Sequence, residues 1–156
     1  MNFDRAVTFV LQWEGGEVND PRDPGGHTKY GISKRAYPHL DITNLTSEQA
    51  IGIYQTDYWE LVKGDELPFP IALQTFDMAV NAGISAGAKC LQRALRTLAD
   101  GIIGPSTLSI AKTSDPKVIA PLLTTERILY YTQLDNWPRY GKGWTKRTIA
   151  ALLEVQ

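Results

Sequence analysis

The stretch that decides how the fold begins is residues 13–32, WEGGEVNDPRDPGGHTKYGI. Upstream of it, Phe3, Val7 and Val10 recur at steps of four and three, which is the spacing of one helix face. Glu14 follows Val10 by four residues and therefore falls on the same apolar face. Two glycines come next and predict the end of the helix. The sequence thus places a carboxyl group in the last turn of a first helix.

This position of Glu14 is costly for a carboxylate. Apolar neighbours and the negative end of the helix dipole both disfavour the ionised form of a carboxyl group. A carboxyl group that keeps its proton near neutral pH can act as a general acid. The alternative is a structural glutamate whose head group reaches water at the helix end. Because a polar, glycine-rich segment follows directly, we expect the functional role.

Asp23 and Thr28 are the candidates for a partner of Glu14. They follow it by nine and fourteen residues, in a stretch whose prolines and glycines turn the chain back. A second carboxylate that faces a general acid can activate water or stabilise positive charge on a sugar ring, and a threonine hydroxyl can hold that water. Asp20 competes with Asp23 for this role. The alternative is plain turn chemistry, because Asp-Pro-Gly-Gly is a strong turn former without any catalysis.

Aromatic and amide side chains elsewhere are candidates for contact with a sugar, since aromatic rings stack on sugar faces and amides hydrogen-bond acetamido groups. Core packing is the default expectation for Tyr54 and Tyr58, given their helical spacing. Asp77 and Asn81 share one helix face, where either can instead be a capping or network residue. The substrate-binding candidates are Tyr30, Tyr58, Asp77 and Asn81.

Aromatic and basic residues alternate near the end of the sequence. They are Trp137, Tyr140 and Trp144, interleaved with Arg139, Lys142, Lys146 and Arg147. Such a strip can bind nucleic acid through stacking, or it can pack a C-terminal helix against the body. We expect the packing role and no nucleic-acid partner, because the net charge is −1.

Composition limits the classes of protein and cofactor. With 156 residues, 43% of them hydrophobic and 21% charged, the chain suits one ordinary globular domain. The single cysteine, Cys90, excludes an internal disulfide. Because His27 and His39 are the only histidines of the sequence, we expect no metal and no organic cofactor. No apolar run approaches the roughly 18 residues of a membrane span.

The start of the sequence has no visible signal peptide, because charged residues interrupt its apolar run. We therefore expect synthesis in the cytoplasm. Work in the periplasm or cell wall would then need a holin-type or other indirect route of release.

The remaining pattern predicts a mainly helical protein, in which residues 28–33 are the best candidate for a short strand or hairpin. Thr46-Ser47-Glu48-Gln49 reads as a capping box that opens a helix to about Trp59. Further helices are expected to start at Pro68–Pro70, after Ser85, at Pro105 and at about Asp115, with a last short helix from Trp144 to Leu153. We expect a single domain over residues 1–156 with two lobes, in which residues 1–84 and 85–156 are two portions.

The same residues resemble a known family. Residues 13–16 and 19–32 resemble the signature of glycoside hydrolase family 108, the lysozyme-like N-acetylmuramidases of phages, prophages and Gram-negative bacteria. The resemblance continues through Ile53-Tyr54, Asp57 to Trp59 and Asp77 to Gly83, and it covers essentially the whole chain. Asp100 to Thr107 resembles the family's predicted peptidoglycan-binding region.

The resemblance implies a fold, a reaction and roles for three residues. The fold would be mainly α, lysozyme-like and two-lobed, with a small β-hairpin near residues 20–35. The reaction would be cleavage of the β-1,4 bond from N-acetylmuramic acid to N-acetylglucosamine in peptidoglycan glycan strands by an endolysin-like monomer. The glutamate of the Glu-Gly-Gly motif, here Glu14, would be the catalytic acid. Asp23 has the nine-residue offset of the phage-type Glu, Asp, Thr arrangement, and Thr28 lies one residue closer to its aspartate than in that arrangement.

Two alternatives stay open at the level of sequence. A lytic transglycosylase needs one acid and forms an anhydro product. A non-catalytic cell-wall-binding or secretion-associated module would keep the fold without the chemistry. The intact Glu14 and Asp-Pro-Gly-Gly stretch favour an active hydrolase over the second alternative.

Overall fold

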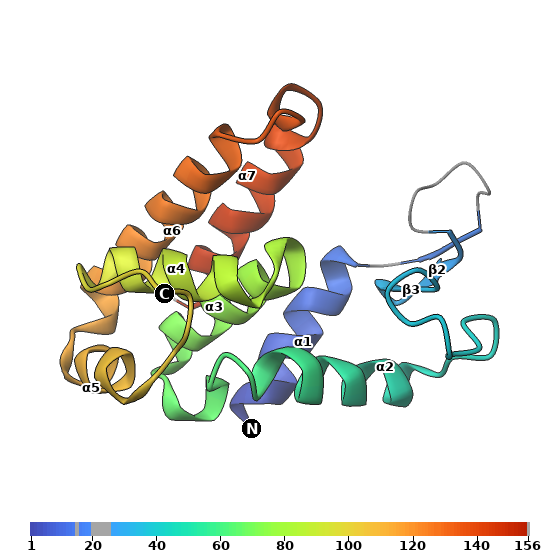
Figure 1. The fold of residues 1–156 in the computed structure, drawn as a ribbon, viewed down its shortest axis with the longest axis horizontal. Coiled ribbons are helices and arrows are strands. Elements are labelled where there is room, and N and C mark those ends of the chain that lie inside the picture. Colours follow the sequence, from blue (N-terminus) through green and yellow to red (C-terminus); the bar gives the residue numbers. More distant parts are fainter. Residues whose placement is uncertain (15, 20–25, 156) are drawn as a thin grey trace.

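The structure is a computed structural model that describes residues 1–14, 16–19 and 26–155. Within these ranges the chain is mainly helical, as expected (Figure 1). The helices are α1 (Asn2–Trp13), α2 (Ser47–Tyr54), α3 (Phe69–Ala82), α4 (Ile84–Ala94), α5 (Pro105–Thr113), α6 (Pro116–Thr132) and α7 (Trp137–Leu153). The strands are β1 (Glu17–Val18), β2 (Thr28–Lys29) and β3 (Ile32–Ser33).

The three short strands form an antiparallel sheet in the order β1-β2-β3. Lys29 lies opposite Ile32, so that Tyr30 and Gly31 form a two-residue turn, with φ angles of 51° and 76°. Positive φ at both central residues is the requirement of a type I′ turn, whose twist matches that of a hairpin. The predicted hairpin at residues 28–33 is therefore confirmed.

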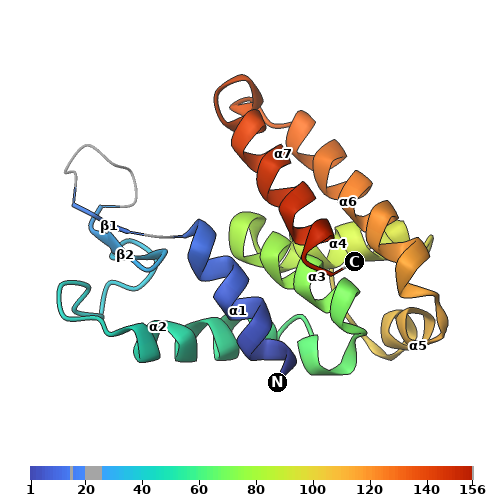
Figure 2. The same cartoon turned by 180° about the vertical axis from the view of Figure 1, so that it is seen from behind.

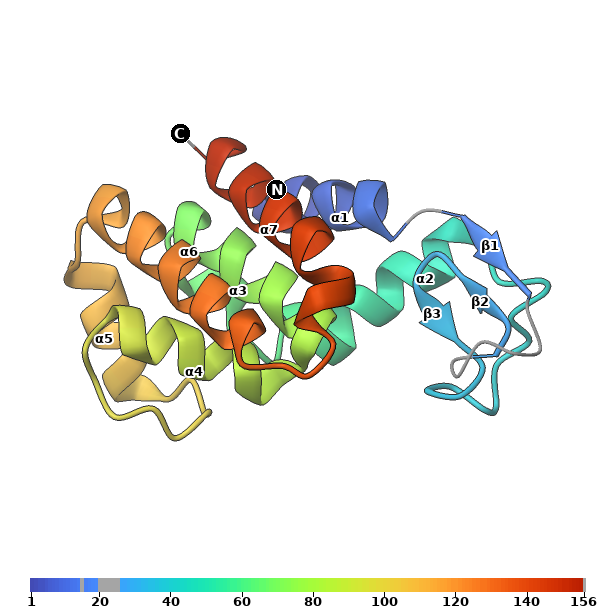
Figure 3. The same ribbon diagram turned by 90° about the horizontal axis from the view of Figure 1, so that it is seen from above.

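The sheet lies at one end of the molecule and α5 at the other (Figures 1 and 3). The C-terminal end of α1 points toward the sheet, as the view from behind shows most clearly (Figure 2). α3 occupies the centre of the helical part, where it contacts α1, α4, α6 and α7. A helix surrounded in this way has few exposed positions, and residues 71–79 of α3 are all buried, including the polar residues Gln74, Thr75 and Asp77.

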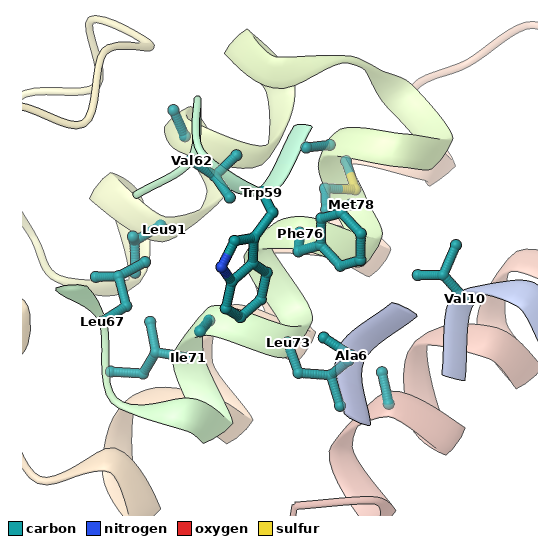
Figure 4. Close-up of a cluster of buried hydrophobic side chains, with 14 of the residues drawn as sticks. Ala6, Val10, Trp59, Val62, Leu67, Ile71, Leu73, Phe76, Met78 and Leu91 are labelled. Atoms are coloured by element: carbon teal, nitrogen blue, oxygen red, sulfur yellow. The ribbon is translucent and has the colours of Figure 1, made fainter. Parts of the chain in front are cut away.

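The core brings the two ends of the chain together. One cluster of buried hydrophobic side chains extends from Phe3 in α1 to Ala151 in α7. Trp59 lies at its middle, with its ring 5.7 Å from that of Phe3 and 5.4 Å from that of Phe76 (Figure 4). The start and the end of the chain thus pack on the same central helix.

Two predicted helix boundaries can now be compared with the structure. The capping box is confirmed by two hydrogen bonds. The backbone N–H of Gln49 donates to Thr46 Oγ1 at 3.2 Å, and the backbone N–H of Thr46 donates to Gln49 Oε1 at 2.9 Å. The α-helix it opens ends at Tyr54, and Gln55–Trp59 continues as π-helix. The Glu60 N–H there donates to the Gln55 carbonyl, five residues back. Such π-helical segments occur frequently at functional sites.

The prediction for the last helix was wrong at its start. We expected this helix to begin at Trp144, but α7 begins at Trp137. Two glycines in this stretch disfavour a helix when taken locally. Gly141 is needed for packing, because a Cβ there would lie 2.5 Å from the ring of Trp137.

None of the described helices is long and apolar enough to cross a membrane.

Candidate active site

Glu14 lies where α1 ends and the sheet begins. Its N–H still donates to the Val10 carbonyl at 3.0 Å, so it forms the C-terminal cap of the helix. Its side chain is 23% exposed. The carboxyl group is therefore anchored on a rigid helix while it keeps some access to solvent.

The hairpin turn packs directly against Glu14. A Cβ at residue 31 would lie 2.9 Å from the Cβ of Glu14 and would overlap the hydroxyl of Tyr54, so only glycine permits this approach. The Tyr54 hydroxyl donates to the carbonyl of Tyr30 at 2.9 Å. The ends of α1 and α2 and the β2–β3 turn therefore meet at the carboxyl group.

A cation from the other end of the sequence also reaches this point. Arg147 Nη1 in α7 donates to Glu14 Oε1 at 2.5 Å. Arg147 Nε donates to Asp77 Oδ1 in α3 at 2.8 Å. The second oxygen of Asp77 accepts from Arg127 Nη2 in α6. Four charged groups thus form a chain in the order Arg127, Asp77, Arg147 and Glu14, which we call the charge chain.

The electrostatics of the site follow from burial and from this pairing. Burial acts to lower the pKa of the Arg147 guanidinium, but the carboxylates of Asp77 and Glu14 outweigh it, so the pKa lies above its ordinary value. Burial and the negative charge of Glu14 raise the pKa of the Tyr54 hydroxyl. Tyr54 is therefore a neutral hydrogen-bond donor beside the carboxyl group.

The expected surroundings of Glu14 need a correction. The apolar stripe of α1 is confirmed, since Phe3, Val7 and Val10 are buried. Sequence reasoning placed only apolar neighbours and a helix end around the carboxyl group, whereas the structure adds a guanidinium in hydrogen-bond contact. An adjacent cation favours the ionised carboxylate and so opposes the effect of burial.

The two proposed partners of Glu14 are placed differently. Asp23, like its competitor Asp20, lies outside the described residues. Thr28 opens β2, is half-buried, and its hydroxyl donates to the Gly26 carbonyl at 3.4 Å. The roles of all three residues stay predictions.

Three of the four substrate-binding candidates are half-buried, and the fourth, Asp77, is fully buried. Tyr30 forms the hairpin turn and Tyr58 packs on Tyr54 with ring centroids 5.8 Å apart, and both are half-buried. Asn81 is half-buried, and its Nδ2 donates to the hydroxyl of Tyr131 at 2.6 Å. Asp77 is 0% exposed and holds two arginines, so it occupies the network role that was its alternative.

Sequence reasoning missed the structural roles of Arg127 and Arg147. A signal existed, because Arg147 lies between Trp144 and Ala151 on one helix face, and Arg127 lies between Leu123 and Tyr131. A basic residue on an apolar helix face points to a buried carboxylate partner. The packing interpretation of the aromatic strip agrees with its geometry, since Trp144 stacks on Tyr131 at 4.9 Å.

Within residues 1–14, 16–19 and 26–155, no group of three or more histidine, cysteine or acidic side chains could hold a metal ion. What the described side chains offer is proton chemistry: one accessible carboxyl group, with a fixed cation and a neutral phenol beside it.

Comparison with known proteins agrees with this architecture. A family model described as glycosyl hydrolase 108 matches residues 7–83, and one described as a predicted peptidoglycan domain matches residues 86–149. The solved structure of Brucella abortus SagA has a TM-score of 0.87 and 32% sequence identity, over 97% of this chain and 91% of that one. Comparison with curated protein sequences gives no significant match.

The fold is therefore a mainly α, lysozyme-like one, and the site is built around a carboxyl group. The chain belongs to the glycosyl hydrolase 108 family. It is a peptidoglycan-related glycoside hydrolase, and peptidoglycan is its partner.

Proposed function

We propose that the protein is an N-acetylmuramidase that hydrolyses the β-1,4 bond between N-acetylmuramic acid and N-acetylglucosamine, with Glu14 as general acid. The observation that carries this proposal is the convergence of α1, the hairpin turn, Tyr54 and Arg147 on one partly exposed carboxyl group. Protonated Glu14 would give its proton to the glycosidic oxygen as the bond to the sugar breaks.

The second carboxylate of this mechanism is assigned to Asp23, with Thr28 holding water beside it. Support comes from the nine-residue offset after Glu14 and from the family resemblance. Thr28 begins the strand that leads into the turn that packs against Glu14. The enzyme would act as a monomer on the cell wall after an indirect release.

Replacement of Glu14 by glutamine tests the proposal. Glu14→Gln keeps the size of the side chain and its contact with Arg147 but cannot give a proton, so release of reducing ends from purified peptidoglycan should fall at least about 10²-fold. Glu60→Gln, the same change at an exposed position, should leave the rate unaltered. Substantial activity in Glu14→Gln would rule out Glu14 as the acid.

Two further readouts make this test specific. Mass spectrometry of the released muropeptides should show the added water of hydrolysis, whereas an anhydro product would identify a transglycosylase. Asp23→Asn should lower the rate more than Asp20→Asn, and the opposite order would transfer the role of second carboxylate to Asp20.

A further inference from the structure

We propose that Arg147 is a positioning residue for Glu14, and that the charge chain sets the pH range over which Glu14 gives up its proton. This inference rests on the proposed role of Glu14 as general acid. It gives a role to Arg127, Asp77 and Arg147. These three residues are buried, so direct contact with substrate does not explain their presence.

With Glu14 ionised, the charge chain carries no net charge, and it is open at one end. Its four groups alternate in sign and come from α6, α3, α7 and the end of α1. Arg127 and Asp77 are fully buried, and the Arg147 side chain is 8% exposed. Buried ions are tolerated when each is paired, so removal of one member leaves its neighbours uncompensated. Glu14 is the member of the chain that solvent or substrate reaches most easily.

Arginine suits the third position because of its geometry. Arg147 uses Nε for Asp77 and Nη1 for Glu14, at 2.8 Å and 2.5 Å. The guanidinium is planar and rigid, so the bond to Asp77 fixes the direction in which the second N–H points at Glu14. A lysine would carry the same charge on one nitrogen, without this fixed fork. Asp77 therefore orients Arg147, and Arg147 orients Glu14.

The cation has two consequences for hydrolysis. When Glu14 gives its proton to the glycosidic oxygen, the electron pair of the breaking bond goes to the leaving sugar and Glu14 becomes a carboxylate. Water then adds to the sugar cation and loses a proton, which returns the acid to its starting state. Arg147 stabilises the carboxylate formed in this step, which speeds proton transfer. It also favours loss of the proton to solvent beforehand, so activity should fall as the pH rises.

Tyr54 and Gly31, which also lie next to Glu14, do not oppose this effect. Tyr54 of α2 faces Glu14 as a neutral phenol, because burial and the negative charge of Glu14 raise the pKa of its hydroxyl. The hairpin contacts Glu14 through Gly31, which has no side-chain charge. Asp77 and Arg127 act from behind Arg147. Among the described residues, Arg147 is the cation paired with Glu14.

The charge chain also joins the two segments that match family models. Glu14 and Asp77 belong to the residues 7–83 matched by the glycosyl hydrolase model, whereas Arg127 and Arg147 belong to residues 86–149, matched by the peptidoglycan model. The segment 86–149 thus supplies, through Arg147, the positive charge next to Glu14.

The test is the pH–rate profile of the full-length protein on purified peptidoglycan, recorded from acid to alkaline pH. The alkaline limb of this profile is the range in which the rate falls as the pH rises. Arg147→Met removes the cation, so this limb should move to higher pH by about one unit, and the maximal rate should fall about tenfold. Asp77→Asn leaves Arg147 with less compensating charge, so the limb should move down. Arg147→Lys should keep the wild-type limb at a reduced rate. Lys146→Met removes an exposed charge from the same helix and should move the limb by less than about 0.3 unit.

The opposite directions of the two shifts distinguish this role from a structural one. A purely structural effect would lower stability and rate in both variants without moving the limb in opposite directions, and that result would overturn the proposal. If Asp77→Asn does not fold, the comparison of Arg147→Met with Arg147→Lys decides, because only the first should move the limb. Sedimentation with peptidoglycan should show unchanged binding. An active Glu14→Gln would instead refute the proposed function, so the two failures are distinguishable.

Discussion

At the scale of single residues, Gly31 decides whether the hairpin can approach the acid. It has a positive φ of 76°, and its missing side chain leaves room for both Glu14 and the Tyr54 hydroxyl. The first property is a matter of backbone conformation, and the second is a matter of space. Gly26 shows only the first, because its φ is 67° but no atom of the described residues lies within 4 Å of a Cβ placed there.

The matched pair Gly31→Ala and Gly26→Ala separates these two costs. Gly26→Ala should lower the free energy of unfolding by about 1 kcal/mol through backbone strain alone. Gly31→Ala adds overlap with Tyr54 and Glu14, so it should cost about 2–4 kcal/mol and also reduce hydrolysis. Urea unfolding and the peptidoglycan assay measure both quantities. Equal effects of the two variants would contradict the packing argument.

At the scale of elements, α7 shows how tertiary packing outweighs helix propensity. Gly141 and Gly143 both lie inside this helix, where glycine is unfavourable. A Cβ at Gly141 would lie 2.5 Å from the Trp137 ring, whereas one at Gly143 would meet no atom within 4 Å among the residues that the structure describes. The same residue type is thus required at one position and merely tolerated at the other.

Alanine at these two positions should have effects of opposite sign on stability. Gly143→Ala should raise the free energy of unfolding by about 0.5–1 kcal/mol, because alanine is the better helix former. Gly141→Ala should lower it by about 1–3 kcal/mol, because the Trp137 ring must move. Thermal and urea unfolding give both values. If Gly141→Ala also stabilised the protein, the close contact with Trp137 would be refuted.

At the scale of the whole molecule, buried thiol and phenol groups determine how the free energy of unfolding changes at alkaline pH. Burial raises the pKa of the Cys90 thiol from 9.0 to about 11. Burial is also the main cause of the raised pKa values of the Tyr37, Tyr54 and Tyr131 hydroxyls, above their ordinary value of 10.0. In each case the folded state holds its proton after the unfolded chain has lost it.

The contribution of these four groups to the free energy of unfolding should therefore be level below about pH 9 and fall as the pH rises above it. Between 9 and 11 the unfolded chain binds fewer protons than the folded one at Cys90, and above 10 the tyrosines add to the slope. Urea unfolding across this range measures the slope, which should decrease in Cys90→Ala. A stability independent of pH from 8 to 11 would refute this account.

Local signals were sufficient wherever one stretch of chain decides its own structure. The apolar stripe of α1, the capping box at Thr46 and the hairpin at residues 28–33 were all predicted, because periodicity, caps and turn residues act over a few neighbours. The start of α7 was not, because glycines at 141 and 143 oppose a helix locally and only the packing of Trp137 explains the first of them.

The candidate site divides in the same way. The sequence by itself determined that Glu14 ends an apolar helix, and that a turn-rich stretch with further carboxyl groups follows. Only the tertiary structure decided that Arg147, 133 residues away, pairs with Glu14, and that Asp77 holds this arginine rather than facing solvent. The physical reason is that an ion pair acts over a few ångströms of space, and no periodicity records which distant helix brings the opposite charge within that distance.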